Sequence, residues 1–265
     1  APLIIGTGTE QVEENLKMFF PAARILRMDR DTLHGKHALS KMHDRIRRHE
    51  VDIIIGTQLV TKGHDFPEVT LVGVILSDLS LNIPDFRASE RTFQLLTQVA
   101  GRAGRGYKPG KVLIQTHNPR HHSLLCAKGH DTRQFRELEL ERRQNLRMPP
   151  FHSLTLVICS SPHEKRAENL IWEIAEKIQI FYSNKKNYSN TDQFTSEIEP
   201  IDSVQVIGPI EAPMKKLRNR FRWQLLLKAD NVRPILRLLK QVLETPPSTR
   251  RDELIQIDVD PHHLM

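Results

Sequence analysis

The residues with the most specific spacing lie between positions 98 and 105, where the sequence reads Gln-Val-Ala-Gly-Arg-Ala-Gly-Arg. Arg102 and Arg105 are three residues apart, which places both guanidinium groups on one side of a helix end. Planar guanidinium groups pair with the oxygens of a phosphoryl group, and Gly101 and Gly104 let a ligand come close to the backbone. The run therefore predicts a phosphate site. The alternative is an ordinary helix end whose arginines are solvated.

A second candidate site follows the apolar run at 53–55, where Gly56 and Thr57 come next. A glycine and a threonine after a strand offer free N–H groups and a hydroxyl at the carboxyl end of a parallel sheet, where ligands normally bind. The alternative is a simple turn, which is the commoner use of this pair of residues.

A basic segment lies between positions 215 and 228 and contains no acid. Strand alternation places Phe221, Trp223 and Leu225 on one face and Arg220, Arg222 and Gln224 on the other. A polyanion could lie along the basic face. The alternative is an aromatic row that packs in the core, backed by a solvated basic face. The basic residues of the segment are Lys215, Lys216, Arg218, Arg220, Arg222 and Lys228.

Histidines and cysteines give no metal site in this interpretation. His117, His121, His122 and His130 surround Cys126, but their spacing fits no common zinc pattern, and the segment is typical of an irregular link after a strand. Two cysteines cannot form a disulfide framework, which indicates a reducing, cytoplasmic setting. No apolar run approaches the roughly 20 residues that cross a bilayer, so we expect no membrane segment.

The strands and helices that must position these residues follow two different orders along the chain. The chain has 265 residues, a net charge of +7 and 38% hydrophobic residues, which favours two globular domains and an anionic partner. Up to about residue 118, expected strands at 3–7, 24–28, 52–57, 71–76 and 111–116 alternate with expected helices at 9–19, 36–49 and 88–100. This βαβ order predicts an α/β domain, a parallel sheet with helices on both faces.

The second order of elements begins after a charged helix at 131–147, which Pro149 and Pro150 terminate. Strands at 152–159, 203–207, 220–229 and 254–259, with helices at 164–181 and 232–243, give the order βαββαβ of a smaller α+β domain. We therefore divide the chain into a domain at 1–128, a linking helix at 129–150 and a domain at 151–265. A mobile surface loop is expected at 183–200, which is rich in Ser, Asn, Lys and Thr.

Together these segments resemble a known family. The run at 98–105 is similar to motif VI of superfamily 2 helicases, and the segments at 6–10, 27–31, 56–67 and 85–91 resemble those of the primosomal replication-restart helicases. The resemblance continues through 141–151, 208–209, 220–224 and 257–261, so it covers nearly the whole chain apart from 183–200. It implies that residues 1–128 form a second RecA-like helicase lobe, which would carry motifs IV to VI.

The resemblance also implies a role for each matching residue. Arg102 and Arg105 would act as arginine fingers on the γ-phosphate of ATP, and Gln98 would couple the nucleotide to the cleft. Nucleotide contacts are implied for Gly63, Asp65 and Gly101. Contacts with single-stranded DNA are implied for Thr57, Gln58 and Lys62. A pocket for the acidic C-terminal tail of the single-stranded-DNA-binding protein is implied for Arg220 and Gln224.

Two sequence signals are absent from the chain. It has no GxxxxGK[ST] phosphate loop and no Asp-Glu-x-His segment after an apolar strand. We therefore expect a fragment that shares ATP and Mg²⁺ with an upstream lobe, with zinc bound only in an upstream module. The fragment alone is expected to be inactive.

The function expected on this basis is that of a monomeric ATP-dependent 3′ to 5′ DNA helicase, which restarts stalled forks and directs primosome assembly. Its expected partners are single-stranded DNA, forked DNA and primosome proteins. One alternative is a non-catalytic module that docks DNA and proteins. The other is a helicase acting on RNA, against which the segments at 62–67 and 85–91 argue.

Overall fold

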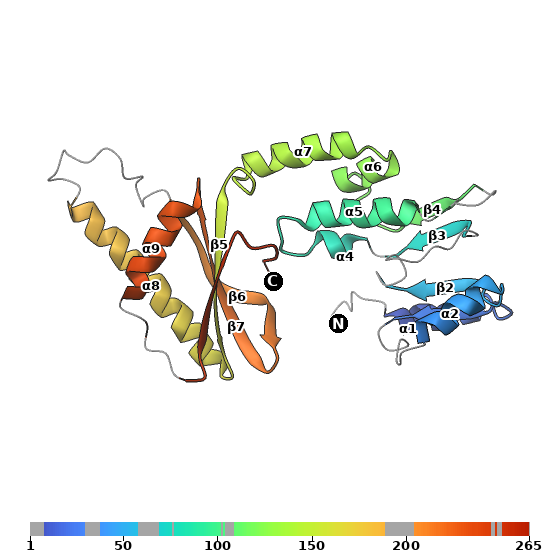
Figure 1. The fold of residues 1–265 in the computed structure, drawn as a ribbon, viewed down its shortest axis with the longest axis horizontal. Helices are drawn as coiled ribbons and strands as arrows, with labels where there is room; N and C mark the ends of the chain where they lie inside the picture. Colours follow the sequence, from blue (N-terminus) through green and yellow to red (C-terminus); the bar gives the residue numbers. More distant parts are fainter. Residues whose placement is uncertain are drawn as a thin grey trace. The chain divides into compact units, whose positions relative to one another are not determined.

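The computed structural model describes residues 8–29, 38–57, 69–75, 77–101, 103, 109–188, 204–244, 247 and 251–264 (Figure 1). The chain divides into two compact units. The first unit consists of Ala1–Leu81 and Glu90–Thr132, and the second consists of Asn82–Ser89 and Arg133–Met265.

The first unit alternates short strands and helices, as the βαβ rhythm predicts. Its described elements are α1 (Thr9–Phe19), β1 (Ile25–Met28), α2 (Ala38–Arg47), β2 (Ile53–Gly56), β3 (Leu71–Val74), α4 (Asp78–Leu81), α5 (Ala88–Ala100), β4 (Lys111–Ile114) and α6 (His122–Lys128). Helix α5 begins in the second unit and continues into the first.

The strands of the first unit pair in parallel. β1 pairs with β2 and β3 with β4, so the described residues form two two-stranded parallel sheets where one continuous sheet was expected. The expected strand at 3–7 lies outside the described residues. Leu26 and Met28 of β1 are buried against Met42 and Ile46 of α2, because the helical spacing of these two residues turns both toward the strand.

The second unit contains α7 (Thr132–Asn145) and a four-stranded antiparallel sheet in the order β6-β7-β5-β8. The order along the chain is βαββαβ, as predicted, and α8 and α9 lie on one side of the sheet (Figure 1). These elements are β5 (Ser153–Ser161), α8 (Glu164–Tyr188), β6 (Gln205–Leu217), β7 (Arg220–Ala229), α9 (Val232–Glu244) and β8 (Leu254–Val259).

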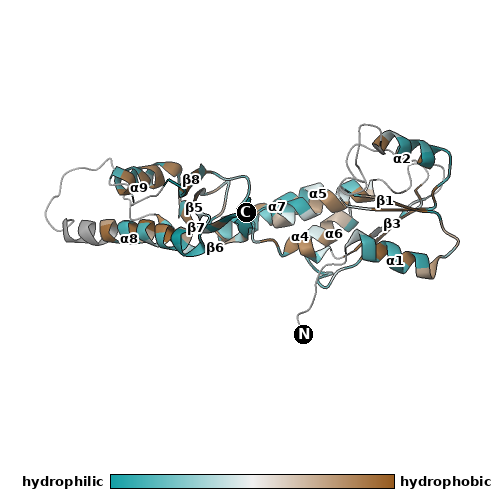
Figure 2. Ribbon diagram, turned by 90° about the horizontal axis from the view of Figure 1, so that it is seen from below, coloured by the Kyte–Doolittle hydropathy of each residue, from teal (hydrophilic) through white to brown (hydrophobic). Residues whose placement is uncertain are grey.

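The core of the second unit lies between the sheet and these two helices. Leu225 and Leu227 of β7 face Ile171 and Ile174 of α8, and all four side chains are buried. In α9 the buried residues Ile235, Leu238, Leu239 and Val242 follow the period of a helix, and Figure 2 shows both hydrophobic and hydrophilic residues on this helix. This packing fixes the position of β7 and of the polar residues on its opposite face.

Two elements differ from the sequence prediction. The segment around the histidines is not an irregular link, because α6 begins at His122 and the side chain of His121 accepts a hydrogen bond from the Ser123 N–H. β6 extends to Leu217 instead of ending at 207, because Arg218 and Asn219 adopt positive φ angles of 50° and 61° and form a tight hairpin turn.

Helix α8 also runs further than expected. It ends at Tyr188, so residues 183–188 of the expected loop are helical, and 189–203 lie outside the described residues. No proline or glycine interrupts this part of the sequence, so nothing in it stops the helix at 181.

Candidate functional site

Helix α5 presents the first part of the arginine-containing run. Phe93, Leu96 and Val99 are buried and hold the helix in the first unit, while Gln98 lies on its exposed side. The helix ends at Ala100, and the Gly101 N–H donates to the Thr97 carbonyl at 3.0 Å. Arg102 and Arg105 lie outside the described residues.

Gly101 has room for a side chain within the chain itself. Among the described residues, a Cβ atom there would meet only the carbonyl oxygens of Thr97 and Gln98, at 3.5 and 3.7 Å, which are ordinary contact distances. The described neighbours therefore do not require a glycine at this position.

Thr57 lies where the sequence places it, directly after β2 and exposed. Met28 of β1 is in register with Gly56 of β2, so both strands end at the same edge of the sheet. Ligands bind at the carboxyl edge of parallel sheets, which makes this edge a candidate contact surface. The other predicted residues of this region, Gln58, Lys62, Gly63 and Asp65, lie outside the described residues.

Asp29 adds a carboxylate to this edge, and no role was predicted for it from the sequence. Its Oδ2 atom accepts a hydrogen bond from Thr9 Oγ1 at 2.8 Å and lies 3.1 Å from Arg27 Nε. Arg27 also pairs with Glu10 at 3.0 Å, and this hydrogen bond is the main reason that the pKa of Arg27 is raised. The network ties the start of α1 to the end of β1. The signal was the alternation Arg-Met-Asp, which puts two charges on one side of a strand.

Arg220 is half-buried and makes hydrogen bonds within the second unit. Its Nη2 atom donates to the carbonyl oxygens of Ser160 at 2.8 Å and Asp252 at 2.7 Å, and its Nε donates to Ser160 Oγ at 3.2 Å. These bonds join β7, β5 and the segment before β8. They use two of the three guanidinium nitrogens.

The interpretation of the polar face of β7 as solvated is wrong for three of its residues. Arg222, Gln224 and Lys228 are only 8%, 7% and 9% exposed. Their cross-strand neighbours on β5 are buried too, and these are Ser160, Ile158 and Leu154. Lys228 donates to the carbonyl oxygen of Leu146 at 3.3 Å. Long polar side chains bury their stems on such an apolar face.

The side chain of Gln224 carries a buried hydrogen-bond acceptor. Its Oε1 atom has no hydrogen-bond partner among the described residues. A buried polar atom left unsatisfied costs about 1–3 kcal/mol, so such atoms are rare unless something else binds them.

The aromatic residues of β7 behave differently from one another. Trp223 is partly buried and packs against the core beneath α8 and α9, which confirms its predicted packing role. The ring of Phe221 instead lies under the ammonium group of Lys216, 4.8 Å from its centroid. This contact is a cation–π pair.

The cysteines and histidines form no reactive centre in the described part of the chain. Burial raises the pKa of Cys159 to about 12, which keeps it a thiol at neutral pH. Cys126 is also buried. No group of three His, Cys, Asp or Glu side chains among the described residues could hold a metal ion.

Helices that could cross a bilayer are missing from the part of the chain that the structure describes.

The first unit has short parallel sheets and the second has a four-stranded antiparallel sheet with helices, so the chain is a mixed α/β protein of two units. Residues 144–262 match the family described as the primosomal protein N C-terminal domain. The chain belongs to the PriA family and corresponds to the C-terminal portion of these proteins.

Three relatives extend this match to almost the whole chain. The chain is 40% identical over 262 residues to the replication restart protein PriA of Bacillus subtilis. It is 38% identical over 256 residues to that of Synechocystis and 36% identical over 259 residues to that of Haemophilus influenzae. The matches cover 98%, 97% and 98% of the chain. The chain spans only 30%, 28% and 33% of the lengths of these relatives.

Proposed function

We propose that this chain is the C-terminal part of an ATP-dependent 3′ to 5′ DNA helicase that restarts stalled replication forks and directs primosome assembly. Residues 1–128 form the second RecA-like lobe, 129–150 the link and 151–265 the C-terminal domain. The observation that carries this proposal is the whole-chain match to replication restart proteins, which includes the phosphate-binding pattern at 98–105.

In this proposal the chain contributes charge stabilisation to ATP hydrolysis. Water attacks the γ-phosphate of an ATP whose β-phosphate and Mg²⁺ are held by another lobe. Arg102 and Arg105 stabilise the charge that develops on the γ-phosphate, and Gln98 links the nucleotide to the cleft. The exposed position of Gln98 at the end of a helix anchored by its apolar face is consistent with this role.

Nucleotide and DNA contacts complete the proposed site of the first unit. Gly63, Asp65 and Gly101 contact the nucleotide, and Thr57, Gln58 and Lys62 contact the backbone of single-stranded DNA. Thr57 supports this assignment because it is exposed at the carboxyl edge of parallel strands.

The second unit serves as a docking site for an acidic peptide tail, in this proposal the C-terminal tail of the single-stranded-DNA-binding protein. Arg220 and Gln224 lie four residues apart on one face of β7, a separation of about 13 Å along a strand, which is the reach of a short peptide. The third nitrogen of the Arg220 guanidinium can pair with a carboxylate, and the unsatisfied Gln224 Oε1 can accept a peptide N–H.

Replacing Gln224 by leucine should separate binding from stability. The variant loses a peptide contact, so tail affinity should fall about tenfold, while removal of an unsatisfied buried oxygen should leave the free energy of unfolding equal or up to about 1 kcal/mol higher. A fluorescence-anisotropy titration of the tail peptide against the full-length protein measures the affinity, and urea unfolding measures the stability.

The matched control is Gln144→Leu, which changes an exposed glutamine of α7 and should alter neither quantity. Arg220→Ala is a poorer probe than the sequence indicated, because it also removes three hydrogen bonds that join β7 to β5 and to the segment before β8. Equal tail affinities for the parent protein and Gln224→Leu would place the partner site elsewhere.

A further inference from the structure

Residues 85–88 form the turn from which α5 begins, and they lie in the second unit. Asp85 is buried, and its Oδ1 atom accepts a hydrogen bond from the Arg87 N–H at 2.9 Å. The Asp85 carbonyl accepts from the Ala88 N–H, also at 2.9 Å. One carboxylate oxygen of Asp85 therefore fixes the start of the helix.

The other oxygen of the same carboxylate holds the end of the chain. Asp85 Oδ2 accepts a hydrogen bond from the Leu264 N–H at 3.3 Å. Beside it, the Arg87 guanidinium donates from Nη1 to His262 Nδ1 at 2.8 Å. Because a guanidinium can only donate, this contact places the proton of a neutral His262 on Nε2.

The chain end is itself fixed to the sheet at Asp260. The Asp260 N–H donates to the Leu154 carbonyl at 2.8 Å, and the Leu154 N–H donates to Asp260 Oδ1 at 3.3 Å. Residues 260–264 thus run from β5 to the turn before α5. We call this segment the C-terminal strap.

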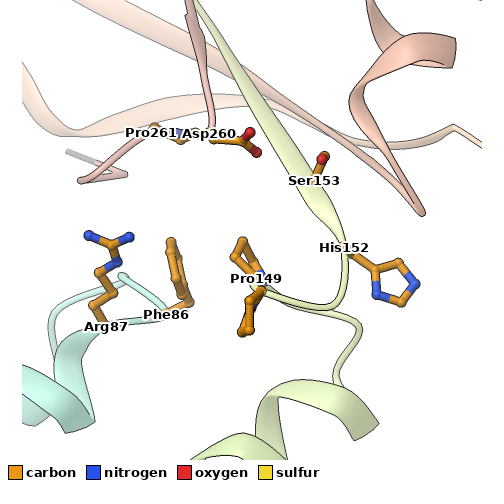
Figure 3. A pocket seen from close by; sticks show the side chains of 8 residues that line it. Phe86, Arg87, Pro149, His152, Ser153, Asp260 and Pro261 are labelled. Carbon is orange, nitrogen blue, oxygen red and sulfur yellow. The ribbon is translucent and has the colours of Figure 1, made fainter.

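The turn at residues 85–88 is also packed against helix α7. The guanidinium groups of Arg87 and Arg143 lie 5.2 and 5.3 Å from the centroid of the Phe86 ring. Arg143 of α7 is held in place by Glu139 at 2.9 Å. A cavity of about 160 Å³ borders this cluster, and Figure 3 shows Arg87, Phe86 and Pro149 in a row that faces Asp260.

Helix α5 then runs unbroken from Ala88 to Ala100 and carries Gln98 in its last turn. A helix transmits a displacement of its first turn along its axis, because each turn is hydrogen-bonded to the next. Asp85 and Arg87 are in this way connected to Gln98 through one continuous helix.

We propose that the C-terminal strap positions α5, so that Asp85 and Arg87 act as positioning residues for Gln98 in ATP hydrolysis. The strap thereby couples the C-terminal unit to nucleotide turnover. This inference rests on the proposed function of the chain.

Asp85→Asn tests the positioning role in the full-length protein. An amide retains one acceptor oxygen for the Arg87 N–H but presents an NH₂ group to the Leu264 N–H, so it releases the strap and keeps the turn. We expect kcat for DNA-stimulated ATP hydrolysis to fall about tenfold while KM for ATP stays within about twofold, as for a coupling of moderate size. His262→Ala, a change at an exposed residue, should lower kcat in the same direction by a smaller factor.

The matched control is Arg237→Ala on α9, which changes an exposed arginine and should leave kcat unchanged. Arg87→Lys should retain part of the parent kcat, because lysine can still donate one hydrogen bond to His262. Parent kcat values for both Asp85→Asn and His262→Ala would overturn the positioning role.

Hydrogen exchange on the 265-residue chain tests the strap without ATP. A chain that ends at Pro261 should exchange the amides of residues 92–96 about fivefold faster than the parent, because the first turns of α5 lose their anchor. Unchanged exchange would overturn the strap. If the full-length parent protein hydrolyses no ATP, the proposed function fails and the positioning role fails with it, whereas the exchange result still decides whether the strap holds α5.

Discussion

Replacing Arg105 by alanine in the full-length protein is expected to lower ATP turnover by a factor of about 10³ or more, because in the proposed site the variant loses the positive charge that stabilises the transferring phosphoryl group. Binding of single-stranded DNA should stay nearly unchanged, since the proposed DNA contacts are Thr57, Gln58 and Lys62. Steady-state ATP hydrolysis at saturating DNA measures the first quantity, and anisotropy with labelled DNA measures the second. Arg102→Ala should behave in the same way.

The control for this pair is Arg136→Ala, which removes an exposed arginine from α7 and should not change turnover. If Arg102→Ala and Arg105→Ala both hydrolyse ATP at the parent rate, the two arginines have no role on the γ-phosphate. They would then be the solvated helix end that the sequence left as an alternative.

Leu225→Ala is expected to give the largest loss of stability in the second unit. The Leu225 side chain is 0% exposed and lies in register with Val157 in the core beneath α8 and α9. Truncating a leucine at such a site leaves a cavity and costs about 2–5 kcal/mol. The chain has two tryptophans, Trp172 and Trp223, and both lie in the second unit, so their fluorescence in a urea titration follows the unfolding of this unit.

A leucine on the outer surface provides the comparison. Leu236 of α9 is 47% exposed, and Leu236→Ala should change the free energy of unfolding by less than about 0.5 kcal/mol. Equal losses for the two variants would contradict the described core.

Regular elements of the second unit could be predicted closely from their hydrophobic period. β7 and β8 have the expected bounds, and α9 extends one residue beyond its predicted end. In these segments the apolar residues are spaced for one structure only, and the tertiary packing agrees with the local preference.

The long strand β6 could not be predicted from its residues. Pro209 and Pro213 argue against a strand, because proline cannot donate a hydrogen bond to a sheet. β6 is an edge strand, so its outer side needs no donor, and the prolines are tolerated. The turn at Arg218 and Asn219 lacks the glycine that usually marks such a hairpin.

In the candidate site, the sequence predicts which residues share a face of a strand, but it does not predict whether that face is buried. Alternation along β7 correctly places Trp223 opposite Arg222 and Gln224, but it cannot tell whether the polar face meets water. Burial of that face depends on neighbours distant in sequence, such as Ile158. For the same reason the contact between Asp85 and Leu264, 179 residues apart, leaves no signal in the local sequence.

The proposed division of the ATP site between two lobes can be tested by comparing ATP hydrolysis by the isolated 265-residue chain and by the full-length protein, both with forked DNA. We expect DNA-stimulated turnover by the full-length protein and none by the isolated chain, because no GxxxxGK[ST] loop in this sequence can hold the β-phosphate. DNA-stimulated turnover by the isolated chain, abolished by Arg105→Ala, would contradict the division of the site between two lobes. Absence of turnover by the full-length protein would leave only the docking module.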